Sequence, residues 1–147
     1  MKSRRALPLL CVVAYCTLVF GQKGPCTEQN VKEQGLKDEE PATWMDDMYF
    51  FNSVVRKPII GKAALQQAQG KAEAQRKNER PNPEIPDKIV ISESADMAYE
   101  YGTTHVEFDD TSSGKHQQLE VAYLRVWRAA GGACKIAATM MQPEDTK

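Results

Sequence analysis

The chain has 147 residues, a formal net charge of −1 and four cysteines. With 27% charged and 41% hydrophobic residues, it has the composition of a globular protein and the length of one domain with its own core. The slight excess of acidic residues argues against a nucleic acid or an anionic membrane as a partner.

Residues 1–21 have the pattern of a secretory signal peptide. A basic start with Lys2 and Arg5 precedes an apolar run from Ala6 to Phe20, which is shorter than the roughly 20 residues of a membrane helix. Removing residues 1–21 takes away three of the 19 basic residues and none of the 20 acidic ones, which leaves 126 residues with a formal charge of −4. We therefore expect a secreted or periplasmic protein, with no stable membrane insertion after cleavage.

Only Cys26 and Cys134 remain after this cleavage, and both would meet an oxidising compartment. They are candidates for a disulfide. The alternative is two independent thiols, one near a loose N-terminus and one buried as a small hydrophobic residue. The sequence leaves both arrangements open, because it does not show whether the two Cα atoms approach within bonding range.

The first half of the expected mature chain contains two predicted helices and one strand. Residues 22–43 form a polar N-terminal segment with a short helix between Thr27 and Glu40, before Pro41. The aromatic and β-branched residues from Met48 to Val55 predict a strand. From Gly61 to Arg80, residues that favour helices predict a second helix.

Arg76, Lys77 and Arg80 gather where that second helix would end, a place that favours cations. A basic patch for nucleic acid is one interpretation of this cluster. Glu73 and Glu79 interrupt it, so the pattern favours a solvated helix face.

The second half predicts a four-strand antiparallel meander. The two long strands carry apolar residues on both faces, which predicts a sheet covered on both sides, by the helices and by a second subunit. A strict two-residue turn at Gly131 and Gly132 would set Arg128 opposite Lys135, so we expect a longer or bulged turn. The predicted strands are residues 85–93, 97–110, 116–128 and 134–141. One face of the strand 116–128 carries Leu119, Val121, Tyr123 and Trp127, and its other face carries Ala122, Leu124 and Val126.

The stretches "PIIGKAAL", "ADMAYEYGTTHVEF" and "YLRVWRAAGGACKIAA" resemble the SnoaL-like proteins of unassigned function in the nuclear transport factor 2-like superfamily. The resemblance covers Trp44 to Pro143 and implies a domain over residues 44–143, with 144–147 as a tail. It implies an α+β, cystatin-like fold: a cone-shaped, strongly bent antiparallel sheet that wraps N-terminal helices. A pocket in the concavity and a homodimer are further implications.

Enzymes that resemble this fold use a carboxylate or histidine base and a tyrosine or acid donor in an apolar pocket. The candidates here are His105 as base, Glu107 or Asp96 to orient it, and Tyr99 or Tyr101 as donor. The alternative is a solvated histidine among packing aromatics. The histidines and cysteines lack metal-ligand spacing, and no phosphate-binding loop or other cofactor motif appears.

The favoured function is an exported, non-catalytic protein that binds a small apolar ligand, serves as a homodimeric accessory protein, or does both. The alternative is an isomerase-like or cyclase-like enzyme with a histidine and carboxylate pair. Apolar walls with a few polar groups are typical of ligand pockets. We expect the pocket walls to include Tyr49, Phe51, Met97, Tyr101, Tyr123 and Trp127.

Overall fold

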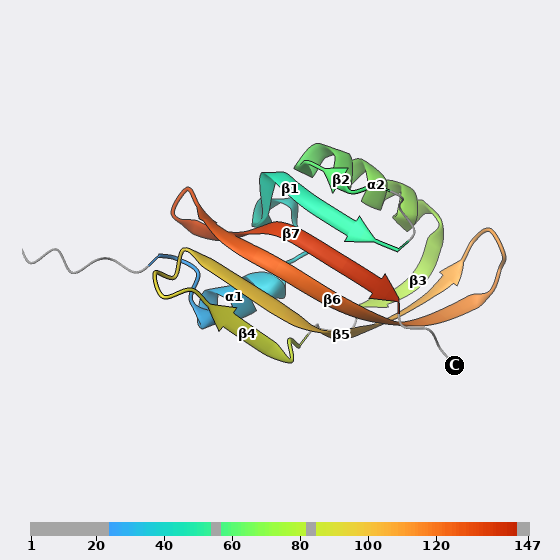
Figure 1. Cartoon of the computed structure of the whole chain (residues 1–147). Helices are drawn as coiled ribbons and strands as arrows, with labels where there is room; N and C mark the ends of the chain where they lie inside the picture. The colour runs from blue at the N-terminus through green and yellow to red at the C-terminus, as the bar shows by residue number, and fades with distance from the viewer. Residues whose placement is uncertain (1–23, 54–56, 82–84, 144–147) are drawn as a thin grey trace, which may run out of the picture.

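The computed structural model describes residues 24–53, 57–81 and 85–143, and within them seven strands form one strongly curved sheet (Figure 1). The strands lie in the order β2-β1-β7-β6-β5-β3, and β4 pairs with β5 on the same edge as β3. Among the described strands, only the pair of β1 and β7 is parallel. The elements are α1 (Glu28–Gly35), a 3-10 turn (Pro41–Thr43), β1 (Trp44–Asn52), β2 (Ile59–Ile60), α2 (Lys62–Ala74), β3 (Arg76–Pro81), β4 (Lys88–Ile91), β5 (Met97–Asp110), β6 (His116–Ala130) and β7 (Ala133–Pro143).

The last four strands form the predicted antiparallel meander. β4 pairs with β5, β5 with β6, and β6 with β7, each with its neighbour in the chain. The α+β class and the strongly bent sheet that the sequence predicts are therefore confirmed. Helix α1 also lies where it was predicted, and the Thr27 hydroxyl caps it by accepting from the Asn30 backbone N–H.

The second helix is shorter than predicted, because α2 ends at Ala74 and the chain continues as β3. The prediction of a helix to Arg80 was wrong. β3 pairs with the far end of the long strand β5, where Lys77 lies opposite Asp109. The Arg76 guanidinium also lies over the Phe108 ring at 4.6 Å. Opposite charges across two strands and an unpaired strand edge outweigh the helix propensity of this stretch.

The first strand begins earlier than predicted, at Trp44 rather than Met48. Asp46 and Asp47 lie inside it as exposed residues, at an irregularity where the register with β7 shifts. The end predicted at Val55 lies outside the described residues.

The turn between β6 and β7 has two residues, Gly131 and Gly132, so the prediction of a longer or bulged turn was wrong. Both glycines have positive φ angles, 58° and 79°, which a two-residue turn matched to the twist of the strands requires. Arg128 therefore lies opposite Lys135. Both point to the solvent side of the sheet, where water weakens their repulsion.

The face of the sheet that α1 and α2 cover, which we call the inner face, carries the core. Trp127 and Ile136 are fully buried there, with Trp44 and Met48 from β1. Each helix adds little apolar surface, since Val31 is the buried residue of α1 and Leu65 that of α2.

The opposite face, which we call the outer face, carries large apolar side chains that the described chain does not cover. Tyr101, Leu124 and Met140 are 42%, 37% and 48% exposed. Leu124 lies opposite both Tyr101 and Met140 in the strand register, so the three are neighbours. The other large apolar side chains of this face are Tyr49, Phe51, Ile60, Met97 and Tyr99.

In the part of the chain that the structure describes, no helix has the length and apolar character needed to cross a membrane. The predicted signal peptide, residues 1–21, and the predicted tail, residues 144–147, lie outside the described residues.

Candidate functional site

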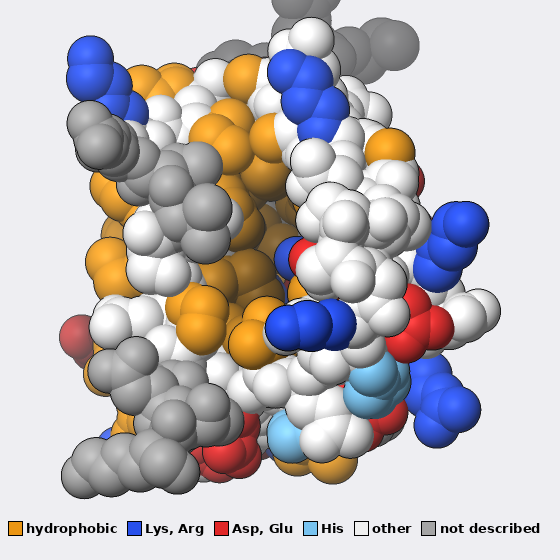
Figure 2. All heavy atoms as spheres, turned by 90° about the vertical axis from the view of Figure 1, so that its right-hand side faces the viewer, with side chains coloured by type: hydrophobic (Ala, Val, Ile, Leu, Met, Phe, Trp, Pro, Cys, Tyr) orange, Lys and Arg blue, Asp and Glu red, His pale blue; other side chains and the backbone are white. Residues whose placement is uncertain are grey.

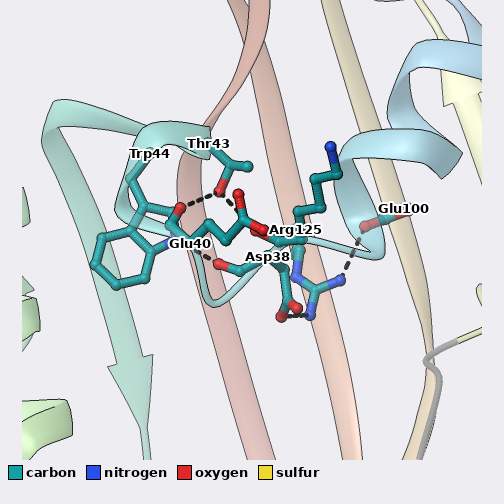
Figure 3. A network of polar contacts seen from close by, with 7 residues as sticks. Asp38, Glu40, Thr43, Trp44, Glu100 and Arg125 are labelled. Carbon is teal, nitrogen blue, oxygen red and sulfur yellow. Dashed lines mark hydrogen bonds and ion pairs between the residues drawn. The ribbon is translucent and has the colours of Figure 1, made fainter.

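Three charged side chains meet on the inner face, and we call Arg125, Glu100 and Asp38 the Arg125 network (Figure 3). Arg125 comes from the middle of β6, and Glu100 lies directly opposite it on β5. The Nη1 of Arg125 donates to Oε1 of Glu100 over 3.1 Å, and its Nη2 donates to Oδ2 of Asp38 over 2.5 Å. One guanidinium thus binds two carboxylates from separate parts of the chain.

The network is buried because of where its residues stand on the strands. Arg125 has the same strand parity as Tyr123 and Trp127, so its side chain points into the core. Arg125 and Glu100 are each 1% exposed, and the guanidinium lies over the Tyr123 ring at 4.7 Å. Charges this deeply buried are stable in a fold only when they are paired, as these are.

The turn between α1 and β1 places Asp38 against Arg125. Thr43 donates its hydroxyl to two backbone carbonyl groups of this turn, and the Trp44 indole N–H donates to the carbonyl oxygen of Asp38 (Figure 3). Thr43 and Trp44 are both buried. These bonds hold the turn in the conformation that directs the Asp38 carboxylate to Arg125.

The electrostatics of the network raise the pKa of both carboxyls. Burial raises the pKa of Asp38 and is opposed by the positive charge of Arg125. Burial also raises the pKa of Glu100, opposed by the charge and hydrogen bond of Arg125 and by the Trp127 indole. Two desolvated carboxyls share one guanidinium, so the ionised network has a net charge of −1.

Glu39 continues this acidic region beyond Asp38. Burial raises the pKa of Glu39, and the nearby negative charges of Asp38, Glu79 and Glu73 raise it further. Glu73 lies at the end of α2 and Glu79 on β3. Carboxylates from three parts of the chain therefore approach one another here, although Glu79 also pairs with Arg76 over 3.1 Å.

A hollow opens on the inner face toward the end of the molecule formed by the β5–β6 hairpin. Figure 2 looks into it from that end and shows hydrophobic side chains around its walls, with acidic and basic atoms at its inner edge. The inner-face residues in this direction are half-buried, unlike those beneath α1. They are Phe50 and Asn52 of β1, Val106 of β5, Leu119 of β6 and Met141 of β7.

Two other open depressions lie on the surface. One runs along the exposed side of α1, and the other lies between β3 and the β5–β6 hairpin, beside the hydrogen-bonded pair Asp109 and His116. Neither is lined by a residue of the Arg125 network.

No protein-family model matches the sequence, and no curated protein matches it. The described fold is nevertheless similar to several solved structures. A nuclear transport factor 2-like superfamily protein from Salmonella enterica matches 82% of this chain and 96% of its own, with a TM-score of 0.65 and 13% identity.

Two further structures share the same architecture. A ketosteroid isomerase-like protein from Erwinia carotovora matches 78% of this chain and 86% of its own, with a TM-score of 0.60 and 16% identity. A nuclear transport factor 2-like protein with a cystatin-like fold, from Novosphingobium aromaticivorans, matches 80% and 75%, with a TM-score of 0.54 and 12% identity. This chain has the nuclear transport factor 2-like fold. The resemblance predicted from the sequence motifs is confirmed at the level of the fold.

Within the nuclear transport factor 2-like fold, the predicted catalytic residues do not lie on the inner face. His105, Glu107 and Tyr99 alternate with Glu100 along β5 and therefore point to the outer face. His105 is exposed and lies opposite Glu120 of β6. Asp96 lies in the turn before β5, where the hydroxyls of two serines donate to it. The structure does not bring these four residues together in the hollow.

The six predicted pocket residues divide between the two faces of the sheet. Tyr123 and Trp127 are buried on the inner face. The other four are exposed on the outer face, so the six cannot line one pocket. In the uninterrupted register of β5 with β6, Met97 lies opposite Arg128 and Tyr101 opposite Leu124, one residue away from Trp127 and Tyr123. Such a register is set by the hairpin and is not revealed by the alternation within one strand. The four outer-face residues are Tyr49, Phe51, Met97 and Tyr101.

Cys26 and Cys134 form a disulfide, with their Cα atoms 4.9 Å apart. Of the two arrangements that the sequence leaves open, the structure has the bonded one. The bond joins the chain just before α1 to the start of β7. Backbone bonds from Gly24 to Ser94 and from Cys26 to Ala95 hold the same segment to the turn before β5.

Across residues 24–53, 57–81 and 85–143, no three histidine, cysteine, aspartate or glutamate side chains gather in a way that could hold a metal ion. The polar groups of the described inner face include two carboxyls, one guanidinium and the hydroxyls of Tyr123, Thr104 and Thr139.

Sequence reasoning missed the Arg125 network. Arg125 did carry a signal, because this charged residue lies on the same strand face as Tyr123 and Trp127, which were predicted to line the pocket. Glu100 alternates with Tyr99 and Tyr101, which were taken to face the pocket. Asp38 carried no signal, since it lies in a uniformly polar segment.

Proposed function

We propose that this chain is an exported, non-catalytic protein that binds a small apolar ligand in the hollow of the inner face and works as a homodimer. The observation that carries the proposal is the hollow, where Figure 2 shows hydrophobic side chains with acidic and basic atoms at the inner edge. A mostly apolar concavity with a few polar groups is the usual design of a ligand site. The position of His105 on the outer face removes the predicted base from it.

The homodimer is supported by the outer face. Tyr101, Leu124 and Met140 form a contiguous exposed apolar surface, and such a surface rimmed by polar residues is typical of an interaction site. The neighbouring part of this face is polar, with His105, Glu107 and Glu120. An apolar centre with a polar margin is the usual composition of a protein interface, and a second copy offers the same surface.

Export is supported by the signal pattern of residues 1–21 together with the disulfide. A disulfide between two buried cysteines persists in the periplasm or outside the cell, where thiols are oxidised.

Native mass spectrometry of the protein purified from the exported fraction tests all three parts. The expected species is a dimer of chains that begin near residue 22, each with its cysteines oxidised, and a bound small molecule. A monomer with intact leader and free thiols contradicts the proposal.

Ligand binding is tested by filling the hollow. Replacing Met141 with tryptophan should weaken the binding of the neutral apolar dye N-phenyl-1-naphthylamine by about tenfold or more, because the larger side chain occupies the space. Replacing the exposed Gln67 of α2 with tryptophan is the matched control and should leave binding unchanged. Equal binding to both variants, or none to the wild type, contradicts the ligand site.

The dimer is tested by charging the outer face. Leu124→Glu should give a monomer by light scattering at micromolar concentration, whereas Gln67→Glu should remain dimeric. A wild-type monomer at this concentration contradicts the dimer.

A second candidate is an acid–base enzyme, which the Arg125 network favours. Asp38 is a largely buried carboxyl beside the Arg125 guanidinium, burial raises its pKa, and a carboxyl in such surroundings can serve as a general acid or base. Deuterium exchange at the carbon next to the carbonyl of an apolar ketone, followed by nuclear magnetic resonance, measures this activity. Asp38→Asn should abolish the exchange and His105→Ala should leave it unchanged; exchange no faster than in buffer excludes this candidate for the ketone.

A further inference from the structure

The Arg125 network limits which ligands the hollow accepts. Arg125 already donates to Glu100 and to Asp38, so its two Nη atoms both bind carboxylates of the protein. The Arg125 side chain is 2% exposed, so a carboxylate on a ligand does not reach the guanidinium while these partners are in place. Glu100 also has a 2% exposed side chain and is out of reach of a ligand.

Asp38 is the member of the network that a ligand can reach. Its side chain is 25% exposed, compared with 2% for Arg125. Its Oδ2 accepts from Arg125, and the backbone N–H groups of Asp38 and Glu39 also donate to the carboxylate, which has about four acceptor sites in all. The member of the network that a ligand can approach is therefore an acceptor of hydrogen bonds.

The negative charge around Asp38 also favours a cationic group of a ligand over an anionic one. With both carboxyls ionised, the network carries one positive and two negative charges. Glu39 lies next to Asp38, close enough for the two negative charges to repel, and Glu73 adds to this repulsion. A bound anion would be repelled here, and a bound cation would be attracted.

We infer that the hollow selects amphipathic ligands whose polar end is an ammonium or hydroxyl group that donates to Asp38, and that it rejects carboxylates. This inference rests on the proposed ligand site. The apolar body of the ligand would contact Phe50, Leu119 and Met141. A charge-assisted hydrogen bond to a partly buried carboxylate is stronger than a neutral one, so the amine ranks above the alcohol.

The test uses three probes with the same apolar chain: octylamine, octanol and octanoate. Each competes with N-phenyl-1-naphthylamine for the wild-type protein at pH 7. We expect octylamine to displace the dye at a concentration at least about tenfold below that of octanoate, with octanol between them. This comparison needs no variant, so it does not depend on the folding of one.

Asp38→Asn assigns the selectivity to its residue, and should reduce the ratio between octylamine and octanoate by about tenfold. The matched control is Asp46→Asn, which removes the same charge from a 98% exposed side chain of β1 and should leave the ratio unchanged. If octanoate displaces the dye at the same concentration as octylamine, the inference about selectivity is overturned, but the proposed ligand site is not. A ratio that survives in Asp38→Asn overturns the role of Asp38, and failure of the dye to bind at all overturns the proposed ligand site itself.

Discussion

The inner and outer faces of the same sheet have similar apolar content but opposite environments. On β6, Tyr123 and Trp127 of the inner face are buried, whereas Leu124 of the outer face is exposed. The cover of the inner face is thin, with one fully buried residue in each helix, and it is held by the disulfide and by the contact of Asp38 with Arg125. The disulfide and the ion pair therefore hold the cover of the inner face in place, whereas the outer face is proposed to be covered by apolar packing of a second subunit.

Removing the disulfide should have the largest effect on the inner face. It closes a loop of 108 residues, and in the chain-entropy model a loop of this length stabilises a fold by about 4–5 kcal/mol. The double variant Cys26→Ala, Cys134→Ala should lower the free energy of unfolding by this amount, measured by urea denaturation of the mature protein. A loss below about 1 kcal/mol would mean that α1 packs on the sheet without this link.

Breaking the Arg125 network should cost nearly as much. Arg125→Met leaves two buried carboxyls without their partner and should lower the free energy of unfolding by about 3–5 kcal/mol. Arg128→Met, on the exposed side of the same strand, is the matched control and should change it little. Replacing all three network residues with Met and Leu should recover most of the loss; if it does not, the network stabilises the fold through more than the pairing of its charges.

A pair of tyrosines compares the two faces directly. Tyr123→Ala removes a buried ring from the inner face and should cost about 3–5 kcal/mol. Tyr101→Ala, on the outer face, should cost about 1 kcal/mol or less in the monomer. If the outer face forms the dimer, the cost of Tyr101→Ala should rise with protein concentration in urea denaturation. Equal costs at every concentration would remove the distinction between the faces.

The buried carboxyls predict a pH dependence of stability that is confined to the inner face. The folded state raises the pKa of Asp38 and Glu100, so it favours their protonated forms. Their contribution is fully present below the unfolded pKa of about 4 and is lost as pH rises through the higher folded pKa values. Relative to Asp38→Asn with Glu100→Gln, the wild type should therefore lose stability as the pH rises above about 4. A difference that is constant with pH contradicts the raised pKa values.

The smallest effects concern the cover of the inner face. An added Cβ at Gly70 of α2 would contact nothing within 4 Å, so Gly70→Ala should raise the free energy of unfolding by about 0.5–1 kcal/mol through helix propensity. Gly102 of β5 is the contrast, because its Cβ would lie 3.0 Å from the Tyr123 hydroxyl. Gly102→Ala should lower the stability in the same urea experiment, and equal signs for the two variants would contradict this contact.

Most of the fold could be predicted from the sequence, because the residue patterns that specify it are local. Alternating apolar residues in the last 60 residues predict the long strands, and the turns between them predict the meander. The stretch from Arg76 to Pro81 could not be predicted in this way. Its composition favours a helix, and only the free edge of β5 makes it a strand.

The candidate site was harder to predict than the fold. Its three residues are far apart in the sequence, and Asp38 approaches Arg125 only because a turn after α1 is held by Thr43 and Trp44. His105 was predicted to be a base inside the pocket, but it alternates with the buried residues of β5 and points to the outer face. A shift of one residue moves a side chain to the opposite face of a sheet, so a site built on strands depends on the register more than on residue types.

The sequence by itself determined the α+β class, the order of the four meander strands and the apolar character of both faces of the sheet, since these depend on the two-residue period of the strands and on the turns between them. The tertiary structure decided which face the helices cover, that Cys26 and Cys134 are bonded, and that Arg125 binds Glu100 and Asp38. These features depend on the approach of residues far apart in the chain, which the curvature and register of the sheet control and a local pattern does not encode.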